Sequence, residues 1–145
     1  YRTQWILSRQ LHHEETQYDI ALRLRADSID SLNQVEIRQI LKEHGFPKKT
    51  EVGTSACEAA WIIIQHAPLD VQKEYLPMLE RAATEGNIQA ALVAALHDRI
   101  DVREGRPQKY GTQRNHNGIC PLLNKKMVNQ WRKEVGLPPL DEYSK

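Results

Sequence analysis

Apolar residues recur along most of the chain at the three- and four-residue spacing of an amphipathic helix. Ile37, Ile40 and Leu41 are one such set, and Gly45, followed two residues later by proline, ends their pattern. The same spacing predicts helices over 1–25 (one helix, or two that break near 12–15), 31–44, 56–67, 70–86, 88–103 and 124–135.

The predicted helix over 56–67 is apolar on almost every side, including the uninterrupted run from Ala59 to Ile64. A helix without a polar face is expected to be surrounded by other elements, so we expect this one at the centre of the fold. Before it, Thr54 or Ser55 with the following Glu58 resembles a capping box, in which such side chains bond the free backbone N–H groups of the first turn.

The segment 106–121 is rich in Gly, Pro and Asn and lacks helical periodicity, which predicts a long loop with a short hairpin around Lys109–Gln113. Loops longer than about 12–15 residues are uncommon in compact domains and are often functional. Pro77 predicts a kink or a restart in the helix that contains it. We therefore predict an all-α fold: a single compact multi-helix domain over 1–145, with a long functional loop before its last helix.

Composition and charge exclude several classes of protein. The chain has 145 residues, of which 40% are hydrophobic and 27% charged, as in an ordinary globular domain. Its formal net charge of +1 provides no strong field to attract nucleic acid, so no nucleic-acid partner is expected. The longest apolar run is far shorter than the roughly 20 residues that cross a bilayer, so we expect no transmembrane segment in this chain.

The two cysteines do not form a metal-binding pattern. Cys57 opens an apolar stretch and is expected to be a small buried thiol, whereas Cys120 lies in the long loop. Neither belongs to a CxxC pair, and no Cys/His spacing is typical of zinc, so neither a metal nor another cofactor is predicted. Whether the two form a disulfide is left open.

Gln65 and His66 end the apolar helix and form the first polar group that could carry chemistry. His66 follows Ile62 and Ile63 by four and three residues, so we expect its ring on their buried face. It is then either a core histidine bonded to a carbonyl, or a neutral imidazole that acts as a general base or ligand contact.

His97, Asp98 and Arg99 form the second group, inside a helix whose other residues are mainly apolar. Adjacent residues point about 100° apart around a helix, so Asp98 and Arg99 are expected to reach different partners. Arg99 either holds a carboxylate or helix end of this chain, or presents its planar guanidinium to an anionic ligand.

The third group alternates amides, a phenol and a hydroxyl between Gln108 and Gln113. If this strip is extended, Gln108, Tyr110 and Thr112 share one side. Such a strip either lines a polar pocket or bonds the ends of buried helices.

We expect these three groups to meet in one polar cavity. As an enzyme, a hydrolase or a transferase, the protein would use His66 as acid and base, Asp98 to orient it and Arg99 to hold an anion. Gln65 and the strip over 108–113, with Tyr110 and Thr112, would then contact the ligand. The alternatives are a module that binds a small molecule or a protein without turnover, and a structural role in which these residues tie the loop to the helices.

Several motifs occur together in one order: Gln-His-Ala at 65–67, Asp-Arg-Ile at 98–100 and Gln-x-Tyr-Gly-Thr-Gln at 108–113. In this order and spacing they resemble an uncharacterised bacterial family, known as a domain of unknown function, over about residues 30–143. Residues 1–29 form a separate N-terminal helical segment in this comparison. Members often carry a lipoprotein or secretory leader, so the resemblance implies the cell envelope or secretion, and it implies no particular reaction.

Overall fold

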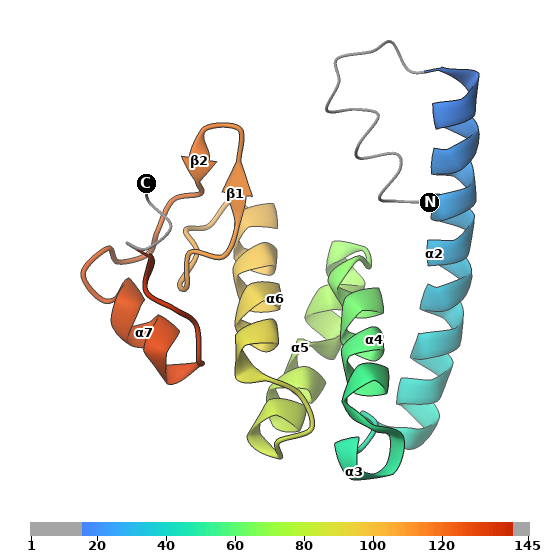
Figure 1. Cartoon of the computed structure of the whole chain (residues 1–145), viewed down its shortest axis with the longest axis horizontal. Helices are drawn as coiled ribbons and strands as arrows, with labels where there is room; N and C mark the ends of the chain where they lie inside the picture. Colours follow the sequence, from blue (N-terminus) through green and yellow to red (C-terminus); the bar gives the residue numbers. More distant parts are fainter. Residues whose placement is uncertain (1–15, 141–145) are drawn as a thin grey trace. The chain divides into compact units, whose positions relative to one another are not determined.

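The computed structural model describes residues 16–140, and within them the protein is helical apart from one two-stranded hairpin (Figure 1). The predicted all-α class is therefore confirmed. The chain divides into two compact units, the first ending at Glu43 and the second beginning at His44. That the whole chain is one domain stays a prediction, and the two units are described separately.

The main element of the first unit is α2, a continuous helix over Gln17–His44. It begins with a reciprocal cap, because the Asp19 backbone N–H donates to Thr16 Oγ1 and the Thr16 N–H donates to the Asp19 carboxylate. The prediction of separate helices over 1–25 and 31–44 is wrong where the structure describes it. Ser28 and Ser31 do not interrupt the helix, because each hydroxyl donates to the carbonyl four residues earlier. The part predicted for 1–15 lies outside the described residues.

The second unit begins with α3 over Lys49–Val52 and α4 over Thr54–Gln65. The short helix α3 lies between the helices predicted over 31–44 and 56–67, where the sequence predicted none. Gly53, with φ of 84°, is the residue before α4, and no side chain caps that helix. The predicted capping box is therefore wrong, because a glycine in this left-handed conformation makes the turn from α3 into α4 and has no side chain to accept from the free backbone N–H groups. Glu58 is left available for another role.

The buried apolar residues of α4 lie on one face of the helix, since Cys57, Ala60 and Ile64 follow one another at three- and four-residue spacing. Ile62 is 47% exposed, so the prediction that this helix is surrounded on all sides is wrong. Folded proteins routinely keep apolar surface in contact with water, and an apolar composition alone does not require enclosure. Cys57 and Cys120 are both buried free thiols, and burial raises the pKa of Cys57.

The centre of the second unit is the pair α5 (Leu69–Thr84) and α6 (Ala90–Arg103), which pack side by side. Leu79 on α5 and Leu96 on α6 have no exposed surface. The helix α5 continues through Pro77, so the predicted restart does not occur. Because proline has no N–H, the backbone carbonyl four residues before Pro77 has no donor within the helix. Pro77 is exposed, so this carbonyl lies on the side of the helix that water reaches.

After α6, the chain forms the hairpin of β1 (Arg114–Asn115) and β2 (Gly118–Ile119), and then α7 over Val128–Glu134 (Figure 1). The antiparallel register pairs Asn115 with Gly118. The hairpin was predicted around Lys109–Gln113, and it forms instead in the residues that directly follow, 114–119. That segment is irregular because its backbone N–H groups bond side chains, as described below. A short bridge still joins Gln108 to Leu122 beneath the hairpin.

Charged side chains form a cluster where α6 ends. The Glu104 carboxylate pairs with Lys73 of α5 and with Arg106, and Arg106 also donates to Asp101 Oδ1 at 2.6 Å. The hydrogen bond from Lys73, followed by that from Arg106, lowers the pKa of Glu104 below its usual range. The cluster therefore joins the end of α6 to α5 as long as Glu104 is ionised.

We expect the stabilisation that Glu104 provides to depend on pH. Its pKa is lower in the folded than in the unfolded state, so the contribution is complete above the unfolded pKa and is lost as pH falls through the folded pKa. Urea unfolding of the wild type and of Glu104→Gln should therefore differ at pH 7 and converge in acid. Glu134→Gln, at an exposed position of α7, is the control, and a difference for Glu104→Gln that persists unchanged in acid would contradict this assignment.

Candidate functional site

Asp98 is the most constrained of the predicted site residues. Its side chain has no exposed surface, and its carboxylate accepts four hydrogen bonds from the loop after α6. Oδ1 accepts from the backbone N–H groups of Lys109 and Tyr110, and Oδ2 accepts from the N–H and hydroxyl of Thr112, each at 2.9 Å. Four donors compensate one buried charge, so Asp98 anchors this loop.

Gln108 and Gln113 complete the anchored loop. The side chain of Gln108, also without exposed surface, accepts from the Gln113 N–H at 2.8 Å and donates to the carbonyls of Gln113 and Cys120 at 2.9 Å. Gln113 Nε2 donates to the Ala95 carbonyl on α6 at 3.3 Å. The amides that the sequence offered as ligand contacts therefore bond the protein's own backbone.

Tyr110 is held from its other side by α7. Arg132 Nη1 donates to the Tyr110 carbonyl at 2.7 Å, and Arg132 Nε donates to the Pro138 carbonyl at 2.6 Å. Lys109 Nζ lies 5.1 Å from the centre of the Tyr110 ring and 5.3 Å from a ring of Trp131, within the range of cation–π attraction. The Tyr110 backbone is therefore held between Asp98 of α6 and Arg132 of α7, and its half-buried ring lies beside Lys109.

Two predictions about His66 are corrected here. The residue is exposed at the end of α4, rather than on the buried face of Ile62 and Ile63. The His66 N–H still bonds the Ile62 carbonyl as in a helix, but the face of α4 that carries Ile62 is not buried, since Ile62 is itself 47% exposed. Nor does Asp98 orient it, since the four donors to Asp98 all come from the loop.

The end of α4 instead faces the far end of α6. Arg103 Nη1 donates to the Ala67 carbonyl at 3.1 Å and to Gln72 Oε1 at 3.0 Å, while Gln72 Nε2 donates to the Gln65 carbonyl at 2.8 Å. Arg99 precedes Arg103 by four residues and shares its side of α6. The Gln65 side-chain oxygen is buried and has no hydrogen-bond partner within residues 16–140.

The three consecutive polar residues of α6 consequently point in three directions. Each residue turns the helix by about 100°, so His97 and Arg99 lie on nearly opposite sides, with Asp98 between them. Asp98 faces the loop, and Arg99 shares the side of Arg103. The structure brings Asp98 together with Gln108, Thr112 and Gln113, and Tyr110 joins them through its backbone. The predicted ligand-binding role of Arg99 stays a prediction.

His97 opens into a hollow that the sequence did not predict. The hollow has a volume of about 160 Å³ and is bounded by Glu80, His97 and Tyr110 over an apolar floor of Ala83, Ala90, Val93, Ala94 and Val135. His97 Nε2 lies 3.7 Å from the Glu80 carboxylate, and Nδ1 lies 3.6 Å from that of Asp101. We call this feature the His97 hollow. In the sequence, the four-residue spacing of His97 and Asp101 on one predicted helix was the pattern that could have pointed to this hollow.

The described part of the chain shows neither a cluster of metal ligands nor a helix that could span a membrane. Between residues 16 and 140, no three His, Cys, Asp or Glu side chains are grouped so that they could hold a metal ion. Within the same range, none of the helices combines the length and the hydrophobicity that crossing a bilayer requires.

One comparison with known proteins gives a match. The family whose sequence pattern matches residues 11–145 is described as "Family of unknown function (DUF6624)". No curated protein and no solved structure shows a significant match to the chain.

Proposed function

The chain belongs to this family of unknown function, and we propose that it is a binding module that recognises its ligand in the His97 hollow. The observation that carries the proposal is the composition of the hollow, in which Glu80, His97 and Tyr110 surround an apolar floor. In this proposal, Asp98 and Gln108 do no chemistry. Their hydrogen bonds hold the loop so that the Tyr110 ring stays at the edge of the hollow.

The size and charge of the hollow indicate the class of ligand. Its volume of about 160 Å³ is roughly half the lower limit of about 300 Å³ for ordinary ligand pockets, so it suits a small head group or one side chain of a protein partner. Among residues 16–140, Glu80 is the only carboxylate that lines it, and the Tyr110 ring adds a surface that attracts cations. We infer a ligand with an ammonium group on a short aliphatic body. The motif resemblance adds a bacterial, envelope-associated or secreted setting to this proposal.

A hydrolase-like function is the second candidate, favoured by one specific observation. Each ring nitrogen of His97 has a carboxylate within 3.7 Å, from Glu80 or from Asp101, and a carboxylate beside one nitrogen can orient an imidazole that acts as a base through the other. In that case the catalytic histidine would be His97 in place of the predicted His66. Ester hydrolysis by the wild type that is lost in His97→Asn would favour this alternative.

The binding proposal predicts that n-butylammonium binds and that the neutral 1-butanol does not. Titration monitored by amide NMR should shift the signals of Ala94, His97 and Tyr110 in a saturable way, with a Kd of about 1 mM, since one ion pair on a small apolar surface provides roughly 4 kcal/mol. Glu80→Gln should weaken this binding about tenfold, because it removes the charge but keeps the shape.

His66→Ala is the matched control, since His66 lies outside the hollow and its loss should leave the Kd unchanged. Equal binding of 1-butanol and n-butylammonium would contradict the proposed charge recognition. Shifts that rise linearly without saturation would contradict the site itself.

A further inference from the structure

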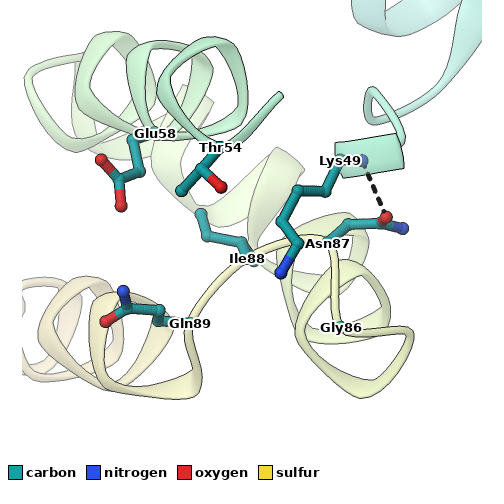
Figure 2. A pocket seen from close by; sticks show the side chains of 7 residues that line it. All are labelled: Lys49, Thr54, Glu58, Gly86, Asn87, Ile88 and Gln89. Carbon is teal, nitrogen blue, oxygen red and sulfur yellow. Dashed lines mark hydrogen bonds between the residues drawn. The ribbon is translucent and has the colours of Figure 1, made fainter. Parts of the chain in front are cut away.

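A second hollow, of about 240 Å³, lies elsewhere in the second unit, between α3, α4 and the segment that joins α5 to α6 (Figure 2). Lys49 lines it from α3, Thr54 and Glu58 from α4, and Ile88 and Gln89 from the connecting segment. It shares no lining residue with the His97 hollow. It can therefore be tested independently of the function proposed above.

Hydrogen bonds hold the frame of this hollow in place. The Lys49 backbone N–H donates to Asn87 Oδ1 at 3.0 Å, which ties α3 to the connecting segment (Figure 2). The Asn87 N–H in turn donates to the Ala82 carbonyl at 2.8 Å, at the end of α5. Ile88 is buried, so it forms a fixed apolar floor. The frame of the hollow thus rests on the Asn87 side chain and the buried Ile88, and not on the charged side chains of Lys49 and Glu58.

Apart from Asn87, the polar side chains around the rim have no partner within residues 16–140. In the described part of the chain, the Lys49 ammonium, the Thr54 hydroxyl, the Glu58 carboxylate and the Gln89 amide make no hydrogen bond and no ion pair. The adjacent Lys48 does pair, with Glu51 at 3.4 Å. The sequence predicted that Glu58 takes part in a helix cap. The structure excludes this role, because no side chain caps α4.

The rim carries both signs of charge, which restricts the ligand. In Figure 2, the Glu58 carboxylate lies at one end of the labelled cluster, the Lys49 ammonium lies nearer its middle beside Ile88, and Thr54 lies between the two charges in the view. An anion alone would leave Glu58 without a partner and beside a like charge, and a cation alone would do the same for Lys49. A ligand with both charges compensates both ends, and each contact is then a charge-assisted hydrogen bond.

We propose that this hollow binds a small zwitterion with one carboxylate and one ammonium group, as in a free α-amino acid. The ligand carboxylate contacts the Lys49 ammonium and the Thr54 hydroxyl, and the ligand ammonium contacts the Glu58 carboxylate. The Gln89 amide provides a further donor and acceptor, and the aliphatic part of the ligand rests on Ile88. The volume of about 240 Å³ is below the usual range of about 300–1,000 Å³ for larger metabolites, which agrees with a ligand of this size.

Three probes of nearly equal shape separate the two charges. L-alanine carries both, L-lactate replaces the ammonium with a hydroxyl, and isopropylamine replaces the carboxylate with a methyl group. In amide NMR titrations of the full chain, L-alanine should shift the signals of Thr54, Ile88 and Gln89 in a saturable way. L-lactate and isopropylamine should bind at least about tenfold more weakly, because each leaves one charged side chain uncompensated.

Charge-neutralising variants assign each end of the ligand. Lys49→Gln should weaken L-alanine binding about tenfold without weakening that of isopropylamine, from which it removes a like charge. Glu58→Gln should weaken L-alanine binding to a similar degree without weakening that of L-lactate, for the same reason. Lys48→Gln and Glu51→Gln are the matched controls, because these neighbouring charges already pair with each other and do not line the hollow. Lys49 is exposed and Glu58 is half-buried, so both variants should fold, which the rest of the amide spectrum checks.

Each other outcome would overturn the proposal in a specific way. Equal affinity for L-lactate and L-alanine would show an anion site, and equal affinity for isopropylamine would show a cation site. Linear shifts with all three probes would show that no site exists. Equal weakening by the control variants would show a general effect of surface charge.

Discussion

Replacement of Asp98 by asparagine should lower the free energy of unfolding by about 3 kcal/mol, which is a large share of the stability of a small domain. The substitution keeps the shape of the side chain but removes its charge. It also turns one of the two acceptor oxygens into an NH₂ donor, which then faces the N–H groups of Lys109 and Tyr110 or the N–H and hydroxyl of Thr112. Buried donors without an acceptor are costly because they have also lost water.

Urea unfolding of the wild type and the variant measures this loss, and amide NMR locates it. The signals of Lys109, Tyr110 and Thr112 should broaden or move, whereas those of α4 should stay in place. Asp70→Asn, at an exposed position of α5, is the control and should change stability by no more than about 0.5 kcal/mol. Equal effects of the two substitutions would show that Asp98 does not anchor the loop.

The second large effect is expected at Gly111, in the middle of the anchored loop. Its φ is +70°, and a Cβ at this position would lie 3.1 Å from Leu122 Cδ2 and 3.1 Å from Leu140 Cδ1. Gly111→Ala therefore combines a left-handed backbone that alanine rarely adopts with overpacking against two leucines. We expect a loss of about 2–4 kcal/mol in the free energy of unfolding, measured in urea.

Gly105→Ala separates these two causes. Gly105 has nearly the same φ, +75°, but a Cβ there would meet nothing within 4 Å. Its replacement should cost only the backbone strain, about 1 kcal/mol. If both variants lose the same stability, packing against Leu122 and Leu140 contributes nothing.

Local periodicity was sufficient to predict the helical class and most helices of the second unit. It failed where the outcome depended on single polar contacts. Ser28 and Ser31 return their hydroxyls to the helix backbone, so α2 is continuous where a break was predicted. The hairpin was misplaced because the backbone N–H groups of residues 109–112 bond Asp98, and no pattern within the loop reveals a partner on a helix.

The sequence identified several residues that meet in the structure, but it did not predict how they lie relative to one another. Asp98, Gln108, Thr112 and Gln113 do meet, as their polarity in an otherwise apolar setting indicated. The exposure of His66 could not be predicted, because no local pattern shows that the face of α4 that carries Ile62 stays uncovered. The approach of Glu80 to His97 was equally hidden, since it depends on how α5 packs against α6.

The anchoring by Asp98 also determines how the loop opens. Its carboxylate is the shared acceptor for Lys109, Tyr110 and Thr112, and Gln108 bonds the same segment to Cys120. Residues 108–113 cannot separate from α6 one at a time without breaking bonds that hold the others, so this segment should open as one cooperative unit. In hydrogen–deuterium exchange its protected amides would then share a single opening free energy, and a mutation anywhere in this network would accelerate all of them together.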